Sequence, residues 1–177
     1  SARLLHGVTG SGKTEVYLRL IERCLEIGKQ VLLLVPEINL TPQLEERIRG
    51  RFPDVSTVSL HSELAEAARE RHWRAAFSGD ARIVLGTRLA IFTPMPHLGL
   101  IVVDEEHDPS FKQQDGMRYS ARDIGVFRAH QLGIPILLGS ATPALESWAN
   151  AQSQRYRLLS LKERANPAAS LPAVNLL

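Results

Sequence analysis

Cysteine and long apolar runs are almost absent from this sequence of 177 residues. Cys24 is the single cysteine, which excludes an intrachain disulfide and a cysteine-based zinc cluster within these residues and is typical of a reducing compartment. No apolar run approaches the ~18 residues of a membrane span, and no charged and then apolar leader opens the chain. We therefore expect a cytoplasmic protein without a membrane partner.

A strong excess of charge is missing as well. Lysine and arginine number 21 against 19 for aspartate and glutamate, a net charge of +2. The composition therefore gives no argument for nucleic-acid binding, and any basic surface has to be local. The 44% hydrophobic content suits one globular domain, which at this length buries about 70% of its extended surface.

A phosphate-binding loop stands near the beginning of the sequence. Residues 7–14 read GVTGSGKT, which fits the pattern at every required position. The glycines let the backbone turn tightly and aim N–H groups at phosphate oxygens, while Lys13 supplies charge for the β- and γ-phosphates and Thr14 a hydroxyl for Mg²⁺. The residues predicted to bind the nucleotide are Gly7, Val8, Thr9, Gly10, Ser11, Gly12, Lys13, Thr14 and Glu15.

Short, β-branched apolar runs alternate with segments of helical spacing. The predicted strands cover residues 3–6, 30–35, 56–60, 81–85, 100–103, 134–138 and 155–161, and the predicted helices cover 15–27, 41–52, 64–77, 121–132 and 144–152. This alternation requires right-handed crossovers. It predicts an α/β fold, a doubly wound parallel sheet flanked by helices, over residues 1–162, with a linker rich in Ala, Pro, Asn and Ser over 163–177.

Local signals refine the helices. Ser120, with Asp123 three residues on, predicts a capping box, and Thr142 followed by proline predicts a second N-cap. Cys24 is expected to be buried. Aromatic and leucine residues at helical spacing are expected in the core, namely Trp73, Phe77, Leu145 and Trp148. Arginines at Arg47, Arg49, Arg51, Arg69, Arg71 and Arg74 are interpreted as a solvated helix face.

An acidic motif follows a buried strand. Residues 98–103 lead directly into Asp104, Glu105, Glu106 and His107, at the strand end where ligands bind in such sheets. We predict that Asp104 holds Mg²⁺ beside Thr14, that Glu105 orients and deprotonates the attacking water, and that His107 relays the state of the phosphate. A solvated acidic turn is the alternative for the motif alone. Lys13 and Glu105 are the predicted catalytic residues.

A small polar loop follows another strand. Residues 139–143 read GSATP, and the hydroxyls of Ser140 and Thr142 are suited to hydrogen-bond His107. We predict that they couple the nucleotide state to the rest of the domain. The alternative is a loop that merely ends in a helix cap.

The three motifs, in this order, resemble motifs I, II and III of superfamily 2 helicases. Further segments extend the resemblance to bacterial replication-restart helicases, the primosomal protein N′ family. They are VPEI at 35–38, LGTR at 85–88, KQ at 112–113 and GSATPALE at 139–146. The resemblance implies a RecA-like first helicase lobe of an ATP-dependent 3′-to-5′ DNA helicase that acts in restart of stalled forks and primosome assembly.

The resemblance also implies partners and parts outside these residues. Forked and single-stranded DNA, single-stranded DNA-binding protein and other primosome proteins are the implied partners. A second lobe that lends a catalytic arginine, and a zinc site, belong to the longer protein and not to this segment. We therefore expect the 177-residue chain to bind nucleotide weakly and not to turn it over.

Several residues are implied to contact DNA. By position, Pro36 lies in motif Ia, and Thr87 and Arg88 lie in motif Ib, which face the nucleic-acid backbone in such helicases. Arg88 is alternatively a partner in a surface ion pair. The segment 108–119 resembles an aromatic-rich loop that couples single-stranded DNA to hydrolysis, in which aromatic rings stack on bases and cations approach phosphates. The residues assigned there are Phe111, Lys112, Arg118, Tyr119 and Arg122, with inward packing as the alternative for Phe111.

Other functions use the same phosphate-binding loop. A small-molecule kinase, another superfamily 2 translocase and a non-catalytic nucleotide-gated module are the alternatives. The acidic motif followed by Ser140 and Thr142, together with the absence of a recognisable acceptor-binding lid, favours the motor. A non-catalytic module would leave Glu105 without a role.

Overall fold

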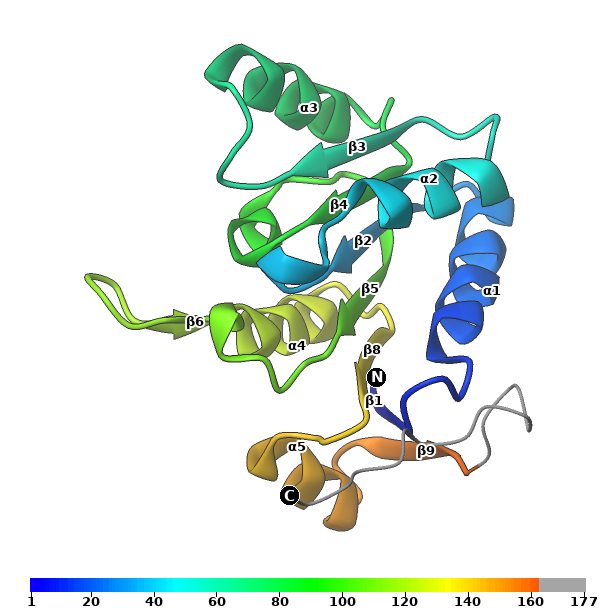
Figure 1. The fold of residues 1–177 in the computed structure, drawn as a ribbon, viewed down its shortest axis with the longest axis vertical. Coiled ribbons are helices and arrows are strands. Elements are labelled where there is room, and N and C mark those ends of the chain that lie inside the picture. The colour runs from blue at the N-terminus through cyan, green and yellow to red at the C-terminus, as the bar shows by residue number, and fades with distance from the viewer. Residues whose placement is uncertain (163–177) are drawn as a thin grey trace, which may run out of the picture.

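Parallel strands form the centre of the molecule. The computed structural model describes residues 1–162 and contains a seven-stranded sheet with the order β3-β4-β2-β5-β8-β1-β9 (Figure 1). The strands are β1 (Ala2–Gly7), β2 (Gln30–Leu34), β3 (Thr57–Leu60), β4 (Ile83–Gly86), β5 (Leu98–Asp104), β8 (Ile136–Ser140) and β9 (Arg157–Leu161). Every neighbouring pair in this sheet is parallel. The predicted parallel sheet is confirmed.

Helices cover both faces of the sheet. They are α1 (Lys13–Glu26), α2 (Pro42–Arg51), α3 (Glu66–Ser78), α4 (Ala121–Gln131) and α5 (Leu145–Gln152). Figure 1 shows α1 and α4 on opposite sides of the strands. Because successive strand residues point to opposite faces, Leu33 packs in the core layer with α1 and α2, whereas Leu32 and Leu34 pack in the layer with α3, α4 and α5.

Short elements complete the fold. The 3-10 turns η1 (Glu37–Asn39), η2 (Arg88–Phe92) and η3 (Pro109–Phe111) follow β2, β4 and the acidic motif. The antiparallel strands β6 (Lys112–Gln113) and β7 (Tyr119–Ser120) form a hairpin that projects away from the sheet (Figure 1). Within the described residues no helix is long and apolar enough to cross a membrane. The predicted linker over residues 163–177 lies outside the described residues.

The structure corrects one predicted helix cap and the predicted burial of four apolar side chains. Ser120 accepts a hydrogen bond from the Asp123 N–H as expected, but α5 begins at Leu145 with Ala144, not Thr142, at its N-cap. Cys24 is buried as predicted. The large apolar side chains expected in the core are partly or largely exposed, although Trp148 among them packs edge-on against His6 of β1. They are Trp73, Phe77, Leu145 and Trp148.

Candidate functional site

Three neighbouring strands end at one edge of the sheet, and a polar loop follows each. The order β5-β8-β1 brings the acidic motif after β5 and the phosphate-binding loop after β1 to either side of the Ser140 loop after β8. A cavity of about 460 Å³ opens at this edge, lined by the phosphate-binding loop together with Arg47, Asp104 and Glu105. Motifs that lie 90 or more residues apart in the sequence therefore share one site.

The phosphate-binding loop has the geometry of an anion cradle. Gly10 and Gly12 have φ angles of +79° and +89°, values that L-residues with side chains rarely adopt. The buried Ser11 hydroxyl has no hydrogen-bond partner within residues 1–162, and α1 begins at Lys13, so its first N–H groups face the same space. These donors fit the phosphates of a nucleotide.

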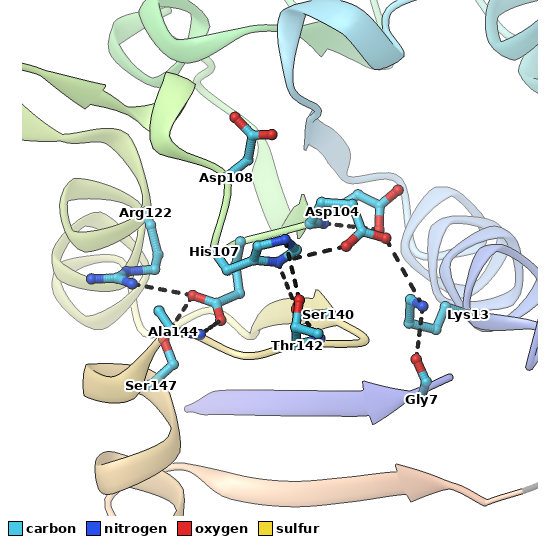
Figure 2. Close-up of polar contacts among 12 residues, drawn as sticks. Gly7, Lys13, Asp104, His107, Asp108, Arg122, Ser140, Thr142, Ala144 and Ser147 are labelled. Carbon is cyan, nitrogen blue, oxygen red and sulfur yellow. Dashed lines mark hydrogen bonds and ion pairs between the residues drawn. The ribbon is translucent and has the colours of Figure 1, made fainter. Parts of the chain in front are cut away.

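Lys13 joins the loop to the acidic motif. Its ammonium is buried, donates a hydrogen bond of 2.9 Å to the Gly7 carbonyl and lies 4.0 Å from Glu105 Oε1 (Figure 2). The cation therefore stands between the phosphate loop and the predicted catalytic carboxylate. A phosphate in the cavity would offer it a stronger partner than a neutral carbonyl.

Asp104 is held by two donors on one oxygen. Its Oδ1 accepts hydrogen bonds from the Tyr17 hydroxyl at 2.8 Å and from the Glu105 N–H at 3.0 Å. Burial raises the pKa of Asp104, and these donors together with Lys13 oppose the increase. Burial and then the charge of Asp104 raise the pKa of Tyr17, so its hydroxyl keeps its proton and acts as the donor.

Glu105 has an unusual backbone conformation. Its φ of +48° lies in the left-handed region, which costs a non-glycine residue roughly 1–2 kcal/mol, and strained residues of this kind cluster at active sites. Burial, and then the charge of Asp104, raises the pKa of Glu105. A carboxylate with a raised pKa is a better proton acceptor than an ordinary one.

His107 contacts the loop that follows β8. Its Nδ1 lies 2.7 Å from Ser140 Oγ and 3.6 Å from Glu105 Oε2, and its Nε2 lies 3.3 Å from Thr142 Oγ1 (Figure 2). The structure thus brings together the three residues predicted to couple nucleotide state to the rest of the domain. Glu105 is in contact with the same imidazole.

Glu106 has a role that the sequence did not reveal. Its side chain is fully buried and accepts hydrogen bonds from Arg122 Nη1 at 3.2 Å, Ala144 N–H at 2.8 Å and Ser147 Oγ at 2.8 Å (Figure 2). The carboxylate therefore connects the start of α5 to Arg122 of α4. The expectation that Arg122 approaches DNA phosphates is wrong, because its guanidinium is buried against Glu106 and Asp123.

Arg47 is a second residue that sequence analysis missed. It lies on α2 and lines the nucleotide cavity, whereas Arg49 and Arg51 on the same helix pair with Glu45 at 3.9 Å and Glu22 at 3.5 Å. No ion pair to Arg47 is found in the part of the chain that the structure describes. The position of Arg47 on its helix predicted only that the side chain is exposed. The cavity could not be predicted from that position, because segments distant in sequence form it.

The residues of the helicase motifs Ia and Ib are less accessible than expected. Pro36 is buried just after β2, and its place at the nucleic-acid backbone stays a prediction. Thr87 is also buried, but it borders a cavity beside His61 and Ser62. Arg88 Nη1 donates to the carbonyls of Ser110 and Lys112, at 3.4 and 3.2 Å. Arg88 thereby fixes the start of the hairpin rather than projecting freely.

The hairpin carries exposed cations and one buried aromatic. Phe111 is 1% exposed and packs in the core, which corrects the expectation that it stacks on bases. Lys112 and Arg118 are exposed. Tyr119 is half-buried and packs edge-to-face on Phe92 of η2, with 5.1 Å between ring centroids. Because Phe92 is 53% exposed, it adds an aromatic surface that the sequence did not indicate.

The fold and the site together define a nucleotide-binding domain of the phosphate-loop class, with an acidic motif after β5, which β8 separates from β1 in the sheet. Within that class the chain belongs to the DEAD/DEAH box helicase family, whose sequence profile matches residues 2–151.

Two curated relatives from different bacteria share one name. The chain is 53% identical over 168 residues to a Haemophilus influenzae protein named "Replication restart protein PriA", covering 95% of this chain and 23% of that protein. A Bacillus subtilis protein of the same name is 50% identical, over 92% of this chain and 20% of the relative. The chain thus spans about a fifth to a quarter of the length of these relatives, and the predicted resemblance is confirmed.

Solved structures share the fold. RecG bound to a three-way DNA junction superposes with a TM-score of 0.67 at 24% identity, over 95% of this chain and 21% of that one. The DUF1998 helicase MrfA bound to DNA has a TM-score of 0.60 at 16% identity, over 92% and 25%. These likenesses confirm a RecA-like helicase lobe as the fold class.

Proposed function

We propose that this chain is the ATP-binding motor lobe of an ATP-dependent 3′-to-5′ DNA helicase that restarts stalled replication forks. The contact between His107 and Ser140 carries the proposal. It joins the acidic motif beside Lys13 to a loop on the neighbouring strand, which a phosphotransferase does not require. Membership of the helicase family and the names of the relatives support the same conclusion.

Each residue of the site has a proposed task. The phosphate-binding loop and Lys13 hold the phosphates of ATP, and Arg47 adds a cation from the far wall of the cavity. Thr14 and Asp104 would hold Mg²⁺, which when bound neutralises phosphate charge. Glu105 orients and deprotonates the attacking water, because it lies beside Lys13 and its pKa is raised. His107 transmits the change through Ser140 and Thr142.

DNA binding is proposed for the surface beside the hairpin. Lys112 and Arg118 supply positive charge, and Tyr119 and Phe92 supply aromatic surface, a combination that binds single strands independently of sequence. Arg88 connects motif Ib to this hairpin through the carbonyls of Ser110 and Lys112. Single-stranded and forked DNA, single-stranded DNA-binding protein and other primosome proteins are the proposed partners, in the bacterial cytoplasm.

The substitution Glu105→Gln in the full-length protein tests the assignment. Because glutamine keeps the shape but is no base, nucleotide binding should persist while ATP hydrolysis falls by roughly 10²- to 10⁴-fold. Asp108→Asn is the matched control, since Asp108 lies on the same segment, points away from Lys13 (Figure 2) and caps η3, while its charge is the smallest of the causes that act on the pKa of Glu105. Equal hydrolysis by Glu105→Gln and Asp108→Asn would refute the role of Glu105.

A further inference from the structure

A buried tyrosine contacts the carboxylate proposed to bind Mg²⁺. Tyr17 lies on α1, four residues after Lys13, and is 2% exposed. Its hydroxyl donates to Asp104 Oδ1 at 2.8 Å. Tyr17 does not line the nucleotide cavity, although Asp104 does. The hydroxyl therefore reaches the carboxylate from its buried side, opposite the space for nucleotide.

The two hydrogen bonds to Asp104 divide its oxygens. Oδ1 accepts from both Tyr17 and the Glu105 N–H. Within residues 1–162 no hydrogen bond to Oδ2 is found, so this oxygen is the one left for a ligand in the cavity. Two donors on one oxygen restrict the rotation of the carboxylate about χ2, an angle that otherwise takes a broad range of values.

Gly139 leaves the space that the tyrosine ring occupies. A Cβ atom at Gly139 would lie 1.7 Å from Tyr17 Oη and 2.8 Å from its Cζ. Any side chain there would displace the hydroxyl from Asp104. Close contact with Tyr17 thus explains why a glycine precedes Ser140. Through this contact the strand end before Ser140 is packed against Tyr17, which bonds Asp104, in addition to the contact between Ser140 and His107.

We propose that Tyr17 is a positioning residue that holds Asp104 in the orientation for Mg²⁺, and that Gly139 is required because it admits the Tyr17 hydroxyl. This inference rests on the proposed function, since Mg²⁺ with nucleotide is the ligand that Asp104 is assigned. Groups that orient a metal ligand typically contribute 10- to 100-fold to metal affinity or activity. The ring of Tyr17 packs with Ile21 and Leu18 in the core, so removal of the hydroxyl alone preserves packing.

Tyr17→Phe in the full-length protein is the test, with Mn²⁺ as the probe in place of Mg²⁺. We expect the Mn²⁺ concentration for half-maximal binding in the presence of ADP, followed by electron paramagnetic resonance, to rise by roughly tenfold or more. Binding of metal-free ADP should be unchanged, because the phosphate-binding loop is intact. Tyr156→Phe, which removes a hydroxyl from a tyrosine that does not line the cavity, is the control and should bind Mn²⁺ as wild type does.

A second substitution separates positioning from general damage. Gly139→Ala should weaken Mn²⁺ binding like Tyr17→Phe, and in the Tyr17→Phe background it should weaken it little further, because the hydrogen bond to Asp104 is already lost there. Thermal unfolding of each variant shows whether it is folded. Mn²⁺ affinity of folded Tyr17→Phe equal to wild type would overturn the inference. If wild-type protein bound neither ADP nor Mn²⁺ with ADP, the proposed function itself would fail.

Discussion

Replacement of Glu106 by alanine should destabilise the lobe more than it alters chemistry. The substitution removes the acceptor for Arg122, the Ala144 N–H and Ser147 at once. Breaking a buried ion pair from one side costs about 3–5 kcal/mol, and Arg122 keeps only its ion pairs with the exposed Asp123 and Glu146. For a domain of this size about 2–4 °C is lost per kcal/mol, so we expect the midpoint of thermal unfolding to fall by roughly 6–20 °C.

Circular dichroism of the 177-residue chain measures this effect, and Glu146→Ala is the matched control. Glu146 lies 3.9 Å from the same Arg122, but its side chain is 61% exposed, so its loss should cost less than about 1 kcal/mol. Glu106→Gln keeps an acceptor and should lie between the two. A melting midpoint for Glu106→Ala within 2 °C of that of Glu146→Ala would refute the structural role. In the full-length protein, a stable Glu106→Gln variant that bound nucleotide but had lost hydrolysis would transfer the catalytic role from Glu105 to Glu106.

Three further predictions concern the hairpin, the buried carboxylate and the isolated chain. Joint replacement of Arg118 and Tyr119 by alanine in the full-length protein should lower the DNA-stimulated rate of hydrolysis at least tenfold more than the basal rate, because each stacked base contributes ~1–3 kcal/mol. A phosphate-release assay measures both rates, and an equal loss of both would indicate general damage. Burial raises the pKa of Asp104, so the folded state binds its proton more tightly than the unfolded chain, and the cost of its charge is present at pH 7 and disappears as the pH falls through the folded pKa. Asp104→Asn should therefore raise the melting midpoint at pH 7, and this gain should shrink as the pH falls toward the ordinary pKa of an aspartate; a gain that grew on acidification would contradict the assigned direction. The 177-residue chain alone should bind ATP weakly in calorimetric titration and release no phosphate. The reason is that the arginine which such motors receive from a second lobe raises the rate of hydrolysis by about 10³- to 10⁵-fold. DNA-stimulated turnover by this chain would refute that reasoning.

The parts that could be predicted from sequence depend on local patterns. The phosphate-binding loop is continuous, so Lys13 and Thr14 could be assigned from spacing alone. Asp104 and Glu105 follow from their place at the end of a buried strand. The parallel sheet follows from the alternation of apolar runs with helical segments.

The remaining features depend on contacts between distant segments. Tyr17 and Asp104 are separated by 87 residues, and nothing in the spacing of either indicates the hydrogen bond. Glu106 was indistinguishable in sequence from its acidic neighbours, because burial decides its role. Helical spacing placed Trp73 and Trp148, on two different helices, at positions expected to be buried. The spacing does not show how much of each ring the rest of the fold covers. The burial of Phe111 has the same cause, since it depends on the path of the loop.

Steady-state phosphate release by the full-length protein, with and without single-stranded DNA, tests the central claim most directly. The lobe described here predicts hydrolysis of ATP that rises severalfold with DNA, delivers phosphate only to water and is abolished by Lys13→Ala, because Lys13 stands between the phosphate loop and Glu105. Hydrolysis unaffected by DNA, transfer of phosphate to another acceptor, or turnover by Lys13→Ala within about threefold of wild type would contradict it.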